Sequence, residues 1–321
     1  DIRLQLKAQE LLAGRRGAIV MMDPNTGAIL AMESSPSYDP NLFVTGISSA
    51  NYSALLNDPA RPLVNRTTQG IYAPASTVKP LRAVMGLNAG ASTPNSRYFG
   101  GPSFSIPGTT KKFRDWRRWG HGWLDVYRAI EVSADTYFYD LAYRVGIDKI
   151  AEMGRRLGLG MRHDLPMSAI AEGNMPDKAW KMERHQAEWR IGDTVNASIG
   201  QGYVLASPLQ LAVMTARIAS GKDITPRLIR AQGDLEIPVP EFAPLGIDPE
   251  HLKAVRAGMN AVVNSPRGTA KGSRVEAAEW KMAGKTGTSQ VRNISAAERA
   301  RGVVSNADLP WRRRDHALFV A

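Results

Sequence analysis

The order of strand-like and helix-like runs is the feature that most constrains the fold of this chain. Apolar runs at 18–22 and 28–32 flank a turn rich in Pro, Asn and Gly, a pattern that predicts a β-hairpin. Two further strand-like runs, 280–291 and 316–321, stand at the opposite end of the sequence. Since helical patterns dominate between these ends, we expect an α+β fold in which both ends build one antiparallel sheet flanked by helices. An all-helical subdomain, at roughly 81–215, would be inserted into it.

The helical patterns follow one another through the chain. They are predicted at 3–13, from 76 to about 90, at 124–157 with a break near Gly146, at 207–220 and at 250–263. Residues 33–75, rich in Ser, Pro and Asn, predict a long surface excursion, and residues 92–122 predict a loop. The sequence ends within a strand-like run at Ala321, so we expect the domain to continue beyond it.

Composition excludes several classes of protein. The 321 residues are 43% hydrophobic, enough for one large core or two modest ones. A net charge of +11 would suit nucleic acid, anionic lipid or an acidic polymer, but the chain has neither zinc-finger spacing nor an RNP-type aromatic motif. We therefore expect no nucleic-acid partner, and either a basic solvated surface or one facing an anionic membrane or cell wall. The absence of cysteine excludes disulfides, thiolate catalysis and cysteine-ligated zinc.

The first motif with catalytic chemistry is Ser76-Thr77-Val78-Lys79. Positions i and i+3 share a helix face, so Lys79 can approach the Ser76 hydroxyl and, with a lowered pKa, act as its base. Backbone N–H groups at the start of that helix would face a developing oxyanion. Ser-x-x-Lys arises by chance about once per 300 residues, and Ser76 alone could be a plain helix N-cap.

The second motif is Ser133-Ala134-Asp135, between helical stretches at 126–132 and 136–143. A Ser and an acidic residue two positions apart could relay a proton and accept a hydrogen bond from Lys79. By itself, the motif is more typical of a helix cap.

The third motif is Lys285-Thr286-Gly287-Thr288, within the strand-like run at 280–291. Gly287 removes a side chain where a ligand backbone must come close. Lys285 offers a cation, and the two threonines offer hydroxyls, for a carboxylate. The alternative is an ordinary strand end with a glycine bulge.

Together the three motifs resemble the active-site trio of penicillin-binding proteins and serine β-lactamases. Residues 63–80 resemble the run that leads into the nucleophile of class B penicillin-binding proteins. Residues 119–122, followed by 131–139, resemble the elongation-specific branch of that class, and 199–202 with 207–211 are similar to a stretch common to the transpeptidases. The resemblance extends from Arg16 to Ala321 and implies a β-lactamase/transpeptidase-like fold, with residues 1–321 as the transpeptidase domain.

The resemblance implies a role for each motif residue. Ser76 attacks the carbonyl between the last two D-alanines of a peptidoglycan stem peptide, and Lys79 takes its proton. Ser133 passes a proton to the leaving amine, while Asp135 orients Ser133 and Lys79. A β-lactam mimics the D-Ala-D-Ala end and leaves an ester on Ser76 that is hydrolysed slowly.

The third motif would bind the substrate. Lys285, Thr286 and Thr288 hold the substrate carboxylate, Gly287 gives the ligand access to the strand, and the Ser76 and Thr288 N–H groups hold the oxyanion. The resemblance implies no cofactor.

Two departures from the family pattern bear on the site. The second motif more often ends in Asn, and Asp135 is typical of the elongation-specific branch. Ala134 stands where some relatives carry Cys within a metal-holding cluster. Asp115 and His121 are possible remaining ligands, but two ligands do not make a zinc site. We therefore predict no metal, and a structural hydrogen-bonding role for His121 in its Gly-flanked turn.

The resemblance also has implications beyond this domain. It implies a pedestal and a single-pass inner-membrane anchor before Asp1, a catalytic domain in the periplasm, and a role in cell elongation and rod shape. Partners would be a membrane glycosyltransferase and other elongation-complex proteins. The alternatives are a serine β-lactamase, whose class A Glu-x-x-Leu-Asn pattern is absent between Ser133 and Lys285, and a penicillin-sensor domain.

Overall fold

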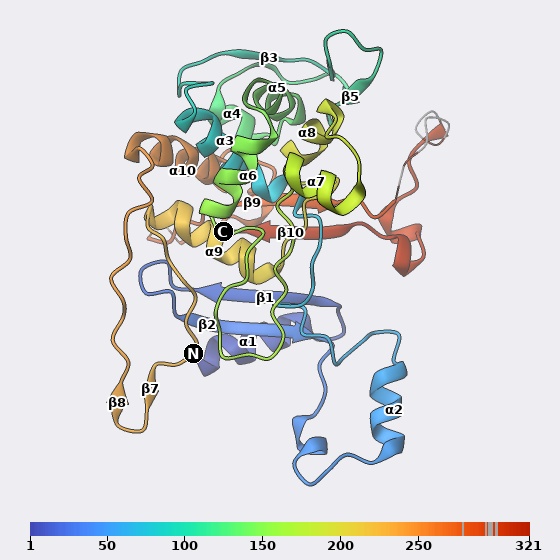
Figure 1. The fold of residues 1–321 in the computed structure, drawn as a ribbon, viewed down its shortest axis with the longest axis vertical. Coiled ribbons are helices and arrows are strands. Elements are labelled where there is room, and N and C mark those ends of the chain that lie inside the picture. The colour runs from blue at the N-terminus through green and yellow to red at the C-terminus, as the bar shows by residue number, and fades with distance from the viewer. Residues whose placement is uncertain (278, 293, 295–297, 299–300) are drawn as a thin grey trace.

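Two antiparallel hairpins, one from each end of the sequence, make the strand layer of the molecule (Figure 1). The computed structural model describes residues 1–277, 279–292, 294, 298 and 301–321. Strand β1 (Gly17–Met22) pairs with β2 (Ile29–Ser35), and β9 (Lys285–Ser289) pairs with β10 (His316–Val320). The predicted N-terminal hairpin and the two predicted C-terminal strands are therefore present, and the C-terminal strands pair as a second hairpin.

The two hairpins are not joined into one hydrogen-bonded sheet. Within the described ranges, β1 pairs only with β2 and β10 pairs only with β9. Between β1 and β10 lies a cavity of about 1280 Å³, which helix α9 (Pro208–Ser220) also lines. The predicted single sheet is thus two separately bonded hairpins with their facing edges unpaired.

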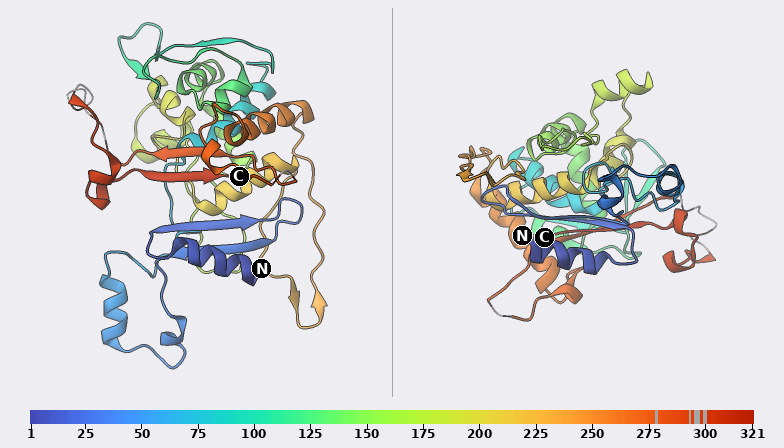
Figure 2. Two further views of the ribbon diagram at one scale, coloured as in Figure 1. Left: turned by 180° about the vertical axis from the view of Figure 1, so that it is seen from behind. Right: turned by 90° about the horizontal axis from the view of Figure 1, so that it is seen from below.

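Helix α1 (Ile2–Leu12) packs against β2, as Figure 2 shows from behind. The Gln5 side-chain amide bonds to both backbone groups of Met32 in β2, as a residue of a neighbouring strand would. Its Oε1 accepts from Met32 N at 2.8 Å, and its Nε2 donates to Met32 O at 3.1 Å. The predicted N-terminal helix is therefore fixed to the hairpin by side-chain hydrogen bonds as well as by apolar contact.

The helices gather above the hairpins around α3 (Lys79–Asn88), in which every residue from Lys79 to Leu87 is buried. A helix buried all round has no solvated stripe, so it belongs at the centre of the core. The other helices of this region are α4 (Val126–Glu131), α5 (Asp135–Val145), α6 (Ile147–Arg156), α7 (Lys178–His185), α8 (Ile191–Ser198) and α10 (Pro249–Asn264). No helix in the described part of the chain is long and apolar enough to span a bilayer.

The inserted region also holds short strands that the sequence did not predict. They are β3 (Tyr98–Gly100), which pairs with β6 (Gly122–Leu124), and β4 (Ser103–Ser105), which pairs with β5 (Lys112–Arg114). Three residues are too few for an alternating pattern to stand out from loop composition. The all-helical description of this insert is therefore incomplete, and the predicted loop at 92–122 is partly strand.

The predicted surface excursion at 33–75 contains α2 (Ser49–Asn57), an arm that projects away from the core in both views (Figures 1 and 2). None of the residues of α2 is buried. A helix that packs against no core needs no apolar stripe, so its sequence did not predict it. A second projection carries the two-residue strands β7 (Ala231–Gln232) and β8 (Leu235–Glu236).

Candidate active site

Ser76 lies in a single 3-10 turn, η2 (Ala75–Val78), that leads directly into α3. Neither element has a side-chain cap, and within the described residues the Ser76 hydroxyl forms no hydrogen bond. The structure therefore gives no support to the N-cap alternative. Ala75 has φ +50°, unfavourable for a residue with a Cβ, and its N–H is held by the Gly200 carbonyl at 2.9 Å.

Lys79, the first residue of α3, is completely buried and joins the first two motifs. Its Nζ donates to Ser133 O at 2.7 Å, to Ser133 Oγ at 3.1 Å and to Asp135 Oδ1 at 2.6 Å. An ammonium has three N–H groups, so the second motif accepts all the hydrogen bonds that a protonated Lys79 can donate. Among the described residues, Lys79 Nζ forms no hydrogen bond with the Ser76 hydroxyl, so the role of Lys79 as the base for Ser76 stays a prediction.

Ser133 occupies the turn between α4 and α5, in a left-handed conformation with φ +56°. Asp135 is the first residue of α5, where the helix N-terminus favours a carboxylate. The cap alternative for Ser133 is not supported, because the Thr136 N–H donates to Asp115 Oδ2 at 3.0 Å and the Ser133 hydroxyl contacts Lys79 instead.

Strand β9 brings the third motif to the same place. Lys285 is fully buried, and burial lowers the pKa of its amine well below the ordinary value, with a further decrease from the nearby Lys79 charge. Its Nζ donates to Thr286 O at 3.0 Å. The Thr286 hydroxyl bonds to that of Thr269 at 2.8 Å, and Thr288 is exposed.

Gly287 allows β9 to lie directly against η2, the turn that carries Ser76. A Cβ at this position would be 2.8 Å from Thr77 Cγ2 and 3.2 Å from Pro74 O. The missing side chain thus makes room for η2. The predicted approach of a ligand backbone to Gly287 stays a prediction, while the glycine-bulge alternative is not needed because β9 and β10 pair in continuous register.

The family profile "Penicillin binding protein transpeptidase domain" matches residues 17–304. This chain belongs to the penicillin-binding protein transpeptidase family. It is 44% identical to Peptidoglycan D,D-transpeptidase MrdA of Escherichia coli (strain K12) over 327 residues, which cover 100% of this chain and 51% of the relative. The chain thus spans about half the length of the curated relatives it matches.

Solved structures of penicillin-binding protein 2 have the same fold. The Pseudomonas aeruginosa protein in complex with WCK 5153 superposes with a TM-score of 0.88 at 43% identity, over 99% of this chain and 68% of that one. The Helicobacter pylori protein in complex with MreC superposes with a TM-score of 0.87 at 34% identity, over 99% and 56%. These comparisons confirm the predicted transpeptidase fold and the predicted branch of the family.

The two possible metal ligands in this family member bond to each other. His121 Nε2 lies 2.8 Å from Asp115 Oδ1, and both side chains are buried. The described residues include no group of three or more His, Cys, Asp or Glu side chains that could hold a metal ion. His121 therefore forms a hydrogen bond, as predicted for its Gly-flanked turn, and its structural role stays a prediction.

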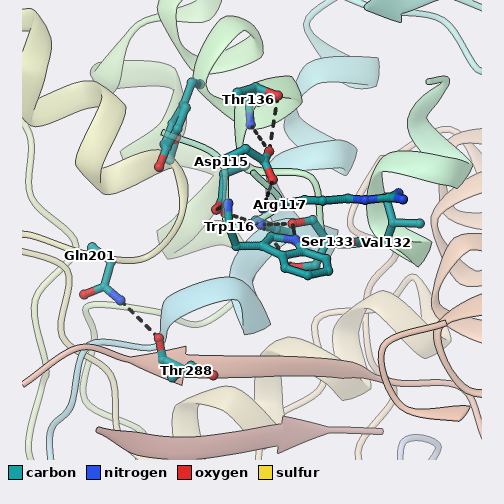
Figure 3. A network of polar contacts seen from close by, with 12 residues as sticks. Asp115, Trp116, Arg117, Val132, Ser133, Thr136, Gln201 and Thr288 are labelled. Atoms are coloured by element: carbon teal, nitrogen blue, oxygen red, sulfur yellow. Dashed lines mark hydrogen bonds and ion pairs between the residues drawn. The ribbon is translucent and has the colours of Figure 1, made fainter. Parts of the chain in front are cut away.

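Two residues form polar contacts with the motifs that were not predicted from the sequence. The Trp116 backbone N–H donates to Asp135 Oδ2. Its indole donates to Ser133 O, and Gln201 Nε2 donates to Thr288 O at 3.3 Å (Figure 3). Both residues lie far in sequence from the groups they contact, so the chain carries no local spacing signal for these contacts.

Proposed function

We propose that the protein is a serine D,D-transpeptidase that cross-links peptidoglycan stem peptides through an acyl ester on Ser76, with residues 1–321 as its transpeptidase domain. One observation carries the proposal: a buried lysine, one helical turn from Ser76, is held by Ser133 and Asp135. Such an amine is poised to exchange a proton with a neighbouring hydroxyl.

Acylation would proceed by a proton relay among these residues. Neutral Lys79 accepts the Ser76 proton as Oγ bonds to the carbonyl carbon between the two D-alanines. The C–N bond then breaks, and the terminal D-alanine leaves as an amine with a proton delivered through Ser133. Asp135 keeps Lys79 and Ser133 aligned throughout, since its carboxylate holds the lysine at 2.6 Å.

Strand β9 would hold the substrate. The backbone N–H groups of Ser76 and Thr288 stabilise the oxyanion, and Lys285 together with the Thr286 and Thr288 hydroxyls binds the terminal carboxylate. The exposure of Thr288 and the partial exposure of Thr286 support this role. An amine of a second stem peptide then attacks the ester, which forms the cross-link and frees Ser76.

The lifetime of the acyl-enzyme tests this proposal against its alternatives. The protein is reacted with a fluorescent penicillin, excess label is removed, and the label that remains on the protein is followed with time. A transpeptidase retains the ester for hours, whereas a β-lactamase loses it in seconds. Turnover of a D-Ala-D-Ala stem peptide with an added acceptor amine then separates the enzyme from a penicillin-sensor domain, which would retain the label but release no D-alanine.

We further propose that the catalytic domain works in the periplasm, on a single-pass anchor in the bacterial inner membrane, and serves cell elongation and rod shape. Its partners would be a membrane glycosyltransferase and elongation-complex proteins. The support is the similarity to a Helicobacter pylori protein that forms a complex with MreC. Co-purification of the full-length protein with such partners from solubilised membranes tests the assignment.

A further inference from the structure

Trp116, in the loop between β5 and β6, lies against the turn that carries Ser133 (Figure 3). The Trp116 backbone N–H donates to Asp135 Oδ2 at 3.2 Å. Its indole Nε1–H is shared between Val132 O and Ser133 O, each at 3.1 Å. Although Trp116 is 60% exposed, its one polar side-chain atom is bonded within the protein. One residue therefore contacts both functional positions of the second motif.

Ser133 needs external support because its backbone is strained. Its φ of +56° lies in the left-handed region, which a residue with a Cβ adopts only when its surroundings impose it. Its carbonyl oxygen accepts from two donors, Lys79 Nζ at 2.7 Å and Trp116 Nε1. Lys79 also donates to the hydroxyl of the same serine. The conformation of this residue thus decides where its hydroxyl points relative to the lysine.

The loop that carries Trp116 is itself fixed at both ends. Asp115 accepts from Arg117 N and Thr136 N, each at 3.0 Å, and from His121 Nε2 at 2.8 Å. These hydrogen bonds tie the loop to the start of α5, with Trp116 beside the second motif.

We propose that Trp116 is a positioning residue for the reaction described above. Its indole N–H holds Ser133 in the left-handed conformation that directs the Ser133 hydroxyl to Lys79, and its backbone N–H orients Asp135. Trp116 acts through these residues and not on the reacting atoms. The inference rests on the proposed function, because it assigns a role in acylation of Ser76.

The test replaces the indole N–H and keeps an aromatic ring. Trp116→Phe is compared with Trp119→Phe, the same substitution on the same loop, where the ring is 80% exposed and contacts the Arg118 guanidinium. The full-length protein is reacted with a fluorescent penicillin, and the chemical rate at saturation, the dissociation constant before acylation and the melting temperature are measured. A second Trp116 variant carries 3-benzothienylalanine, which matches the shape of tryptophan without the N–H.

Loss of one hydrogen bond that acts in the chemical step corresponds to about tenfold in rate. We expect both Trp116 variants to slow the chemical step by this factor, while their dissociation constants and melting temperatures stay near those of Trp119→Phe. The inference is overturned if the benzothienylalanine variant is acylated as fast as wild type. A lower melting temperature with an unchanged chemical rate overturns it as well, because that pattern belongs to a purely structural residue. Absence of acylation in the wild type would instead overturn the proposed function.

Discussion

At the residue scale, the site contains two fully buried lysines, Lys79 and Lys285, and both interact with the carboxylate of Asp135. Lys79 bonds to Asp135 directly, and Lys285 interacts with both of these charges. A buried cation is costly unless it is paired, and one carboxylate cannot pair fully with two ammonium groups. The pKa of Lys285 is lowered as a consequence, and the burial of its amine reduces the free energy of unfolding.

Because burial of the Lys285 amine is unfavourable, replacement of Lys285 by an apolar residue should stabilise the protein. Because the folded-state pKa lies below the ordinary value near 10.5, the unfolded chain binds more protons between the two values. The wild-type free energy of unfolding should therefore rise with pH across that window. We expect Lys285→Met to increase the free energy of unfolding at pH 7 by about 1–4 kcal/mol, with a gain that shrinks as pH approaches 10.5, and to lose penicillin acylation.

Urea titrations between pH 7 and pH 10 measure this effect. Lys281→Met is the matched control, since Lys281 is exposed just before the same strand and its replacement should change stability by less than about 0.5 kcal/mol. A Lys285→Met protein that is less stable than wild type throughout this range would show that the lysine is well paired and that its burial carries no cost.

At the element scale, the site depends on how closely β9 approaches η2. The 3-10 turn presents Ser76, the strand presents the third motif, and Gly287 sets their separation because no side chain stands between them. The strained backbone of Ala75 holds the other side of the turn through its bond to Gly200. The relative placement of two elements, rather than any one side chain, thus brings Ser76 together with the third motif.

Gly287→Ala should push these elements apart. The added Cβ would lie 2.8 Å from Thr77 Cγ2, and overpacking of this kind costs about 1–3 kcal/mol. We expect a destabilisation of that size and a slower acylation by penicillin, measured by denaturant titration and by label uptake. Gly272→Ala, where an added Cβ meets no atom within 4 Å, should leave both nearly unchanged. Equal acylation rates for the two variants would argue against this account of η2 and β9.

Sequence patterns predicted the elements that have long apolar periodicity. The two terminal hairpins, the helix after Ser76 and the break near Gly146 all lie where the sequence placed them. Helices α7 and α8 and the four short strands of the insert were missed, because they are brief and their formation depends on tertiary contacts. The three motifs could be predicted as one site only because they occur together. The contacts of Trp116 join groups distant in sequence, which no local pattern encodes.

At the scale of the whole molecule, strands from the two ends of the chain lie on either side of an open cavity. Strands β1 and β10 both line this cavity of about 1280 Å³, and no hydrogen-bond ladder crosses it in the part of the chain that the structure describes. In an antiparallel pair, alternate N–H groups point away from the partner strand. In β1 and β10, the N–H groups that point away from the partner strand face the cavity, where no carbonyl of a neighbouring strand accepts a hydrogen bond from them.

Amide hydrogen exchange should therefore alternate along these two strands. We expect residues of β1 and β10 whose N–H groups bond to the partner strand to be protected, and their alternate neighbours to exchange at least about tenfold faster. In α3, which is buried all round, protection should be uniform. Uniform protection along β1 and β10 would show that the two hairpins share a continuous ladder in solution.

Ser76 is the proposed nucleophile, and the residue that penicillin acylates is the direct test of that role. The protein is incubated with a labelled penicillin, digested, and mapped by tandem mass spectrometry, with Ser76→Ala treated in parallel. We expect one adduct, on Ser76, and none in the variant. An adduct on Ser133 or any other residue of the wild type, or no adduct on the folded protein, would contradict it.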